Sequence, residues 1–293
     1  MRRRGFSGSA PAANRRNPAH KRVLVVLSIL FGVYTVTLLF PFAWMLFNSV
    51  KTKNEFFAAQ WALPERVLWS NYAEIFRLFD LGSMLVNSLI LCIGCATVSV
   101  LSTCFASYAL AKFRFRLHKF LYWMALSGLL FPVAGGLPSL YKLMQDIHLF
   151  DTHIGIILMA ASGFGMNFLL MYAYMRNISD AYMEAAVIDG AGYWRTFIQI
   201  ILPQTTGLTG TLWILGFIGM WNNFETTFVF LPSYQTIATG IKYIGDNITS
   251  GEYALDYPKY FAAILLTTLP MVVLFLIFQK RIMQLSLGGG IKG

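Results

Sequence analysis

Six stretches of this chain run for about 20 residues or more without Asp, Glu, Lys or Arg, and a helix needs roughly that length of apolar sequence to cross a bilayer. The charged fraction of the chain is 12%, about half of the roughly 25% that is usual in soluble domains. In lipid only helices and closed barrels satisfy the backbone, and these stretches lack the alternation of barrel strands. The sequence therefore predicts an all-α, polytopic membrane protein with six transmembrane helices.

The uncharged stretches divide the chain into one membrane domain, 23–283, and two short tails. The first tail, 1–22, is polar and is expected to be disordered, and the last, 284–293, follows the final stretch. An interhelical loop, 176–203, separates the fourth and fifth spans. The six predicted spans lie at about 23–50, 82–111, 120–142, 153–175, 198–231 and 258–279.

The net charge of +10 is explained by its distribution. If the N-terminus is cytoplasmic and the spans alternate, sixteen of the 23 Lys and Arg residues fall on the cytoplasmic side and seven outside. An excess of Lys and Arg on cytoplasmic loops is the usual topology signal of membrane proteins. The charge thus predicts cytoplasmic N- and C-termini and a protein that contacts membrane lipid, and it gives no support for nucleic-acid binding.

Motifs for catalysis and metal binding are missing from the sequence. The dipeptide Gly-Lys does not occur, so the chain has no phosphate-binding loop of the Walker type. Cys92, Cys95 and Cys104 all fall in the second span, where cysteine usually packs as a small apolar residue. We therefore expect a transport subunit with no catalytic residue, no metal and no cofactor of its own, rather than an enzyme.

The loop 176–203 differs in composition from the other connections, since it combines charge, small residues and glycine. Ser179 and Asp180 belong to the residue types that favour helix N-caps, and residues that favour a helix follow as far as Asp189. Gly190-Ala191-Gly192 then breaks the helix, because glycine costs roughly 1 kcal/mol relative to alanine within a helix.

A second helix is predicted to begin at Tyr193 and to continue into the fifth span, where Pro203 should kink it. In the first helix Met183, Ala186 and Val187 have the spacing of an apolar stripe. A compact helix–turn–helix of this kind is suited to docking into a groove of a partner. The alternative is an ordinary interhelical loop whose helix lies on the membrane surface.

The same loop resembles the EAA loop of ABC importer permeases, which in that family is the coupling-helix pair seated in a cleft of the ATPase subunit. All the signature positions match. By resemblance they form the ATPase-coupling site, in which the acidic residue contacts the ATPase, the alanines allow close approach and the glycine permits the turn. They are Glu184, Ala185, Ala186, Asp189, Gly190, Ile200, Leu202 and Pro203.

Two further stretches resemble the carbohydrate branch of these permeases. The sequence WNNF at 221–224 is similar to the Trp-Asn pair of its fifth span, and the ending GGGIKG is similar to its C-terminal tail. The chain thus looks like a MalG-like, binding-protein-dependent transport component. The stretch 162–179 resembles permeases for larger saccharides, such as an alginate-type system. Two positions depart from the family pattern, since Ser179 and Glu225-Thr226-Thr227 stand where proline is usual.

The resemblance implies a complete transporter of several chains in the bacterial cytoplasmic (inner) membrane. A second, homologous permease forms a heterodimer with this chain, and two ATPase subunits bind on the cytoplasmic face. ATP and Mg belong to those ATPases. An extracytoplasmic solute-binding protein delivers the sugar or oligosaccharide, and closure of the ATPases drives alternating access.

A single acidic residue, Glu225, interrupts the apolar stretch near the end of the fifth span. Charged residues within a membrane usually face a cavity or a partner, which places Glu225 on the translocation path with Trp221, Asn222 and Asn223. An aromatic ring beside an amide is a common way to hold a sugar. The alternative is that Glu225 caps the outer end of the span and that Trp221 anchors it at the interface.

Two other functions are compatible with part of the sequence. An ABC permease for amino acids or peptides would share the loop but not the Trp-Asn pair or the C-terminal Lys-Gly. A secondary transporter driven by an ion gradient could use Glu225 as a proton carrier. Such a transporter has no use for a coupling loop, and the sequence shows no obvious inverted repeat of interrupted spans.

Overall fold

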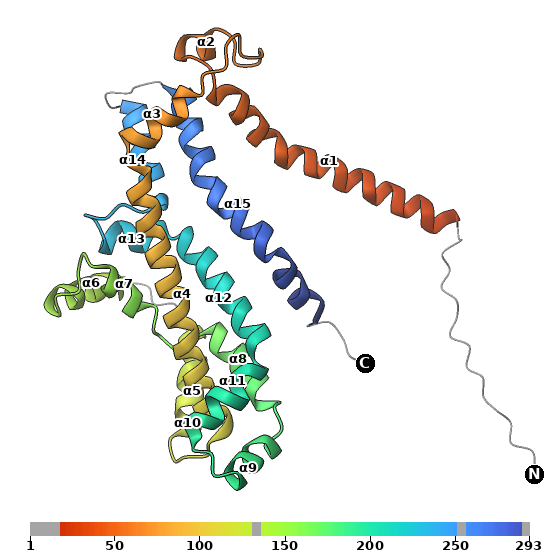
Figure 1. Cartoon of the computed structure of the whole chain (residues 1–293), viewed down its shortest axis with the longest axis vertical. Coiled ribbons are helices and arrows are strands. Elements are labelled where there is room, and N and C mark those ends of the chain that lie inside the picture. The colour runs from red at the N-terminus through yellow and green to blue at the C-terminus, as the bar shows by residue number, and fades with distance from the viewer. Residues whose placement is uncertain (1–17, 131–135, 251–255, 289–293) are drawn as a thin grey trace, which may run out of the picture.

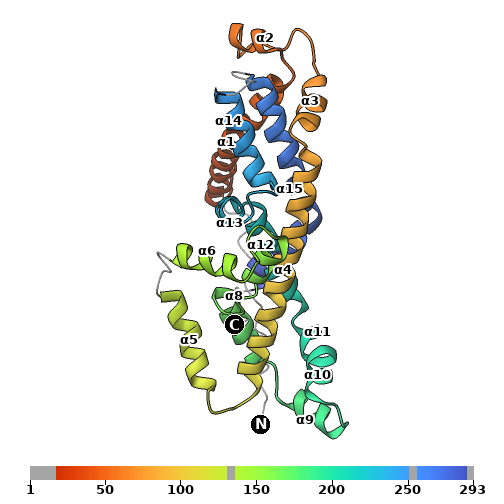
Figure 2. The same ribbon diagram turned by 90° about the vertical axis from the view of Figure 1, so that its left-hand side faces the viewer.

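The computed structural model describes residues 18–130, 136–250 and 256–288, and within these ranges every regular element is helical. Figures 1 and 2 show an elongated molecule in which α4, α12 and α15 run along the length of the body. The short helices α2 and α3 lie at one end, and α9 and α10 lie at the other. The predicted all-α architecture is confirmed.

The helices follow one another along the chain without intervening strands in the described residues. Their bounds are α1 Pro18–Ser49, α2 Lys53–Ala58, α3 Ser70–Leu78, α4 Leu81–Lys112, α5 His118–Leu130, α6 Gly136–Asp146, α7 His153–Met159, α8 Met166–Arg176, α9 Ala181–Ile188, α10 Tyr193–Thr196, η1 Phe197–Ile201, α11 Leu202–Gln204, α12 Thr206–Trp221, α13 Phe224–Phe230, α14 Ile237–Ser250 and α15 Tyr257–Gly288.

Helix α4 is the centre of the packing. It begins at Asp80, whose side chain accepts a hydrogen bond from the backbone of Ser83, and no proline interrupts its 32 residues. Its buried side chains contribute to every one of the apolar clusters that hold the described helices together. Those side chains include Met84, Leu91, Cys92, Cys95, Ala96, Val100, Cys104, Tyr108 and Leu110.

Small residues bring α4 close to its neighbours. A Cβ added to Gly216 of α12 would lie 3.6 Å from the Cα of Ala96, and one added to Gly94 would lie 2.5 Å from the Cδ1 of Ile157. Close approach of this kind is typical of helices that associate within membranes. All three cysteines are buried in this helix as free thiols, which agrees with their predicted packing role.

Helix α1 leaves the body at the end that carries α2 and projects away from it (Figure 1). Its apolar side chains from Val23 to Phe42 are exposed, while its C-terminal end packs on α15, where the rings of Trp44 and Phe261 lie 5.3 Å apart. Among the described residues three helices are long and apolar enough to cross a membrane: Lys21–Ser49, Leu81–Lys112 and Tyr257–Gln279.

Each of the predicted spans 120–142 and 153–175 contains parts of two helices. The first divides into α5 and the amphipathic α6, which turns across the body (Figure 2). The second divides into α7 and α8, because Gly163 and Gly165 adopt positive φ angles of 62° and 129°. Glycine reaches such angles without steric cost, and hydropathy does not report them.

The predicted span 198–231 is interrupted twice. A π-helical turn, Phe197–Ile201, precedes Pro203. Proline has no backbone NH to donate, and its ring clashes with the carbonyl oxygen four residues earlier, so the regular α-helical turn before it is disrupted. Farther on, α12 ends at Trp221, and Asn223 begins α13 by accepting a hydrogen bond from the backbone of Thr226 at 3.0 Å. Asparagine provides an N-cap that an apolar residue cannot provide.

The two predicted tails are shorter in the structure. Helix α1 begins at Pro18 rather than at Val23, with proline at a position that helices accept in their first turn. Helix α15 continues to Gly288, past the predicted end of the sixth span. Residues 1–17, which are expected to be disordered, and residues 289–293 lie outside the part of the chain that the structure describes.

Gly155 is expected to be essential for the packing of α7. A Cβ at this position would lie 2.2 Å from the backbone oxygen of Leu149, so Gly155→Ala should destabilise the protein by about 1–3 kcal/mol, as overpacking does. Thermal unfolding of the purified chain in detergent, followed by tryptophan fluorescence, measures this change. The matched control is Gly128→Ala in α5, where nothing lies within 4 Å. A similar loss of stability in both variants would contradict the prediction.

Candidate functional site

The loop 176–203 forms a helix–turn–helix at one end of the molecule (Figure 1). Helix α9 ends in a Schellman motif, in which the backbone NH of Ala191 donates to the oxygen of Ala186 at 2.8 Å and that of Gly190 donates to Val187 at 3.0 Å. Gly190 adopts a φ of 72°, which this motif requires and which glycine provides without strain. The predicted helix, glycine turn and second helix are therefore present.

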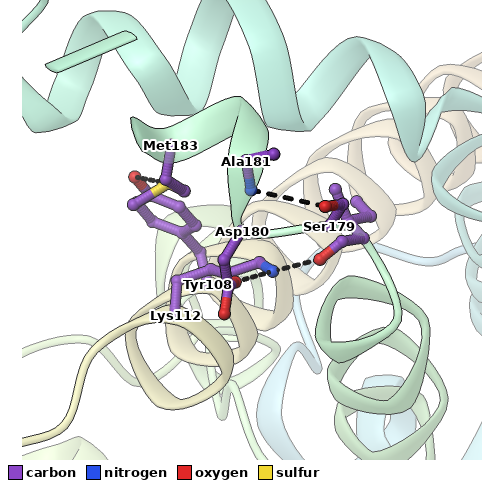
Figure 3. A network of polar contacts seen from close by, with 7 residues as sticks. Tyr108, Lys112, Ser179, Asp180, Ala181 and Met183 are labelled. Atoms are coloured by element: carbon purple, nitrogen blue, oxygen red, sulfur yellow. Dashed lines mark hydrogen bonds and ion pairs between the residues drawn. The ribbon is translucent and has the colours of Figure 1, made fainter. Parts of the chain in front are cut away.

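The start of α9 differs from the prediction. Asp180 has helical backbone angles and makes no capping hydrogen bond, because its carboxylate pairs with Lys112 of α4 at 2.8 Å (Figure 3). The hydrogen bond from Lys112 lowers the pKa of the Asp180 carboxyl below its usual value, so this carboxylate stays ionised at neutral pH. Ser179 assists the first turn instead, since its hydroxyl oxygen accepts from the backbone of Ala181 at 3.3 Å.

Helix α4 holds both helices of the loop through its last two turns. The ammonium group of Lys112 donates to the backbone oxygen of Ile178 as well as to Asp180. One turn earlier, the hydroxyl of Tyr108 lies 3.3 Å from the backbone oxygen of Tyr193. The same hydroxyl lies 3.7 Å from the sulfur of Met183 (Figure 3). The loop is therefore presented on a rigid support.

The signature residues of α9 divide between its two faces. Ala186 is buried, and Met183 is half-buried against the cluster that contains Tyr108. Glu184, Ala185 and Asp189 are exposed. The predicted apolar stripe thus holds for Met183 and Ala186 but not for Val187, which is 63% exposed.

Large apolar side chains cover the free end of the loop. They are Val187, Ile188, Tyr193 and Trp194, of which Ile188 is 85% exposed. We call these four residues the apolar tip. Single exposed apolar residues are ordinary, but a group rimmed by polar residues marks a surface for a partner or a membrane.

The remaining signature residues, Ile200, Leu202 and Pro203, connect the loop to α12. Ile200 and Leu202 are partly buried against the cluster that contains Phe197 and Ile201, and Pro203 is exposed. Their positions in the π-helical turn and α11 let the chain change direction between α10 and α12. They contribute to the shape of the loop rather than to its exposed surface.

The second predicted group surrounds the break between α12 and α13. Trp221 is 6% exposed and packs on Phe217, with their rings 6.1 Å apart. Asn222 is exposed, and its amide donates to the backbone oxygen of Ile218 at 2.9 Å. Both residues line a cavity of about 510 Å³ together with Phe224, Lys242, Thr267 and Thr268.

Asn223 and Glu225 have different places. Asn223 is the N-cap of α13, so its side-chain oxygen is occupied by the backbone. Glu225 is exposed in the first turn of α13, where a carboxylate is stabilised by the helix dipole, and it is not among the residues that line this cavity. Of the four predicted path residues, the structure brings Trp221 and Asn222 together at one cavity.

Tyr108 and Lys112 were not predicted to belong to the loop site, and Thr267 and Thr268 were not predicted to line the cavity. Each of them comes from a helix distant in sequence, and no local pattern connects them. Within the described ranges no group of three or more His, Cys, Asp or Glu side chains is arranged to hold a metal ion.

Known proteins similar to this chain are transport components. Residues 5–284 match the family model described as "Binding-protein-dependent transport system inner membrane component". The diacetylchitobiose uptake system permease protein NgcG of Streptomyces coelicolor is 30% identical over 275 residues, which cover 94% of this chain and 89% of that protein. The melibiose/raffinose/stachyose import permease protein MelC of Bacillus subtilis is 27% identical, with coverage of 94% and 99%.

A solved structure shares the fold. It is described as a bacterial ABC transporter involved in the import of the acidic polysaccharide alginate. The alignment covers 90% of this protein and 98% of the matched chain, with a TM-score of 0.75 and 21% sequence identity. The chain belongs to the binding-protein-dependent transport system inner membrane components, which are membrane permease subunits of ABC importers and leave ATP hydrolysis to a separate ATPase.

Proposed function

We propose that this chain is one of two homologous permeases in a sugar or oligosaccharide importer, and that the loop 176–203 docks on the ATPase. The apolar tip carries this proposal. Four large apolar side chains are exposed at the end of a loop that Lys112 and Tyr108 attach to α4. A rigid support and an exposed apolar surface are what a docking element needs.

The exposed signature residues are assigned to the ATPase interface. Glu184 offers a charge beside the apolar tip, and Ala185 leaves room for close approach of the partner. Asp189 and Gly190 form the turn that separates the two helices. The other signature residues do not contact the ATPase in this proposal but set the orientation of α9 and α10. They are Ala186, Ile200, Leu202 and Pro203.

Carbohydrate is proposed as the substrate because NgcG and MelC are named for diacetylchitobiose and for melibiose, raffinose and stachyose. The cavity at Trp221 and Asn222 offers an aromatic ring, an amide and two threonine hydroxyls, which are groups that hold sugars. We assign Glu225 to the same pathway as an exposed acceptor of hydrogen bonds from hydroxyl groups, with Asn223 as its structural support.

The distribution of Lys and Arg supports cytoplasmic N- and C-termini. In that orientation the loop 176–203 faces the ATPases, and α2 and α3 at the opposite end face the extracytoplasmic binding protein (Figure 1). The rival functions are import of amino acids or peptides and ion-coupled transport. The apolar tip disfavours the second, because a secondary transporter needs no surface of this kind.

Co-purification tests the proposed assembly. We expect the tagged chain, extracted from its native membrane in mild detergent, to retain a second permease and an ATPase with Walker motifs, both identified by mass spectrometry. In proteoliposomes with the binding protein, the complex should take up at least one of diacetylchitobiose, melibiose, raffinose and stachyose only when ATP is supplied. A chain that purifies alone, or uptake that persists without ATP, would overturn the proposal.

Gly190→Val should lower ATP hydrolysis by the assembled transporter several-fold. Valine at a φ of 72° is strained by about 1–2 kcal/mol, so the turn between α9 and α10 should change shape. Steric contact is not the cause, since no heavy atom lies within 4 Å of a Cβ at this position. Gly190→Asn is the control, because asparagine accepts left-handed angles. Equal hydrolysis by both variants would contradict the role assigned to the turn.

Asn222→Ala should reduce sugar uptake while the purified transporter keeps its assembly and thermal stability. The reason is that Asn222 lines the cavity and exposes its amide. Asn247→Ala in α14 is the matched control, because both amides donate to the backbone oxygen four residues earlier at 2.9 Å. Initial rates of uptake of labelled sugar compare the two variants. The same reduction in each would show that loss of this helix hydrogen bond, rather than the cavity, is responsible.

A further inference from the structure

We infer that Lys112 locks the loop 176–203 to α4, so that the loop and α4 move as one body and α4 carries the movement to residues 235–237 at its other end. This inference rests on the proposed docking of the loop on the ATPase and gives that function a mechanical route. It makes Lys112 a positioning residue, since it contacts neither the apolar tip nor the cavity.

The side chain of Lys112 is buried and its ammonium group is hydrogen-bonded. Its side chain is 1% exposed, although a buried ammonium group is unfavourable unless it is paired and hydrogen-bonded. Here it has two acceptors, the carboxylate of Asp180 and the backbone oxygen of Ile178. Both belong to the short stretch that leads into α9, so the bonds fix where α9 begins. Lys112 also ends α4, where a positive charge is favoured by the helix dipole.

Aromatic contacts reinforce the lock on the side of α10. The rings of Tyr108 and Phe113 lie 5.2 Å apart, and those of Phe113 and Tyr193 also lie 5.2 Å apart, both edge to face. The Tyr108 hydroxyl reaches the backbone oxygen of Tyr193 at 3.3 Å. The last turns of α4 therefore hold α9 by charge and α10 by aromatic packing, so a force on either helix reaches α4.

The far end of α4 is attached to the chain between α13 and α14. The hydroxyl oxygen of Ser88 accepts from the backbone NH of Ile237 at 2.8 Å, and the amide of Asn87 donates to the backbone oxygen of Gln235 at 3.0 Å. Ser88 and Lys112 are about 36 Å apart along the helix at 1.5 Å per residue. Helix α4 contains no proline, so no proline kink interrupts it between these two attachments.

The attached segment adjoins the two cavities near the break after Trp221. Ile237 lines the cavity of about 510 Å³, and Gln235 lines a second one of about 290 Å³ between α13 and α14. A displacement of the loop would therefore reach the walls of both cavities through one helix. Figure 1 shows α4 running along the body between these regions.

The test is Lys112→Met in the complete transporter, because methionine keeps the apolar stem and removes the ammonium group. The substrate is whichever of diacetylchitobiose, melibiose, raffinose and stachyose the wild-type transporter accumulates. We expect the ratio of sugar taken up to ATP hydrolysed to fall at least about fivefold in Lys112→Met, which is the lower end of usual coupling factors. Lys112→Arg, which keeps the charge and the donors, should restore most of this ratio. A merely structural role would lower uptake and hydrolysis together and leave the ratio unchanged.

The matched control is Lys259→Met. Lys259 lies 2.9 Å from Glu74 and 3.2 Å from Asp256, so the substitution also breaks a lysine–carboxylate pair, but one far from the loop. Its ratio should equal that of the wild type. If Lys112→Met fails to assemble, Asp180→Asn replaces it, since Asp180 is 79% exposed and its substitution weakens only one side of the lock. The ratio should then fall in the same direction by a smaller factor.

A direct measurement of position completes the test. Spin labels at the exposed residues Leu101 of α4 and Tyr182 of α9 report the distance between the two helices in the assembled transporter. We expect Lys112→Met to broaden the distance distribution and Lys259→Met to leave it unchanged. An unchanged distribution and an unchanged ratio in Lys112→Met would overturn the inference. If the wild type itself shows no ATP-dependent uptake, the proposed function fails instead.

Discussion

The packing of this protein depends on one uninterrupted helix, α4. Its small and apolar residues face neighbours on several sides, and the close approach at Gly94 and Ala96 allows α7 and α12 to pack directly on its backbone. Every apolar cluster among the described helices includes residues of α4. A substitution that enlarges this surface would therefore disturb several contacts at once, because packed interiors do not deform continuously.

The chain of the predicted fifth span, which packs on α4, is interrupted where the two candidate functional regions lie. The break at Asn222 and Asn223 places backbone and side-chain polar groups beside a cavity, and the π-helical turn before Pro203 redirects the chain into the loop that carries the apolar tip. Irregular backbone is tolerated within a membrane protein where it lines a cavity or is buried in protein. The continuous α4 and the interrupted segment α10–α13 thus have complementary roles, since α4 is proposed to transmit position and the interruptions form the candidate sites.

The local structure of the loop was predictable because it depends on short-range chemistry. Gly190 ends α9 through a motif that needs a left-handed residue, and Pro203 interrupts the helix that follows. Asp180 occupies the N-cap position of α9 but makes no capping hydrogen bond, since its carboxylate pairs with Lys112, which lies 68 residues earlier. The positive φ angles at Gly163 and Gly165, which divide the fourth span, were also missed because hydropathy averages over them.

From the amino-acid sequence alone it follows that the chain is helical, that it belongs in a membrane and that residues 176–203 form a helix–turn–helix that resembles the EAA loop. These properties follow from runs of uncharged residues, glycine and proline, whose effects are local. Three relations become visible in the folded chain: Lys112 and Tyr108 hold this loop, Trp221 and Asn222 share a cavity with α14 and α15, and Glu225 lies outside that cavity. Those relations depend on how distant helices pack on α4, and no pattern along the chain encodes that packing.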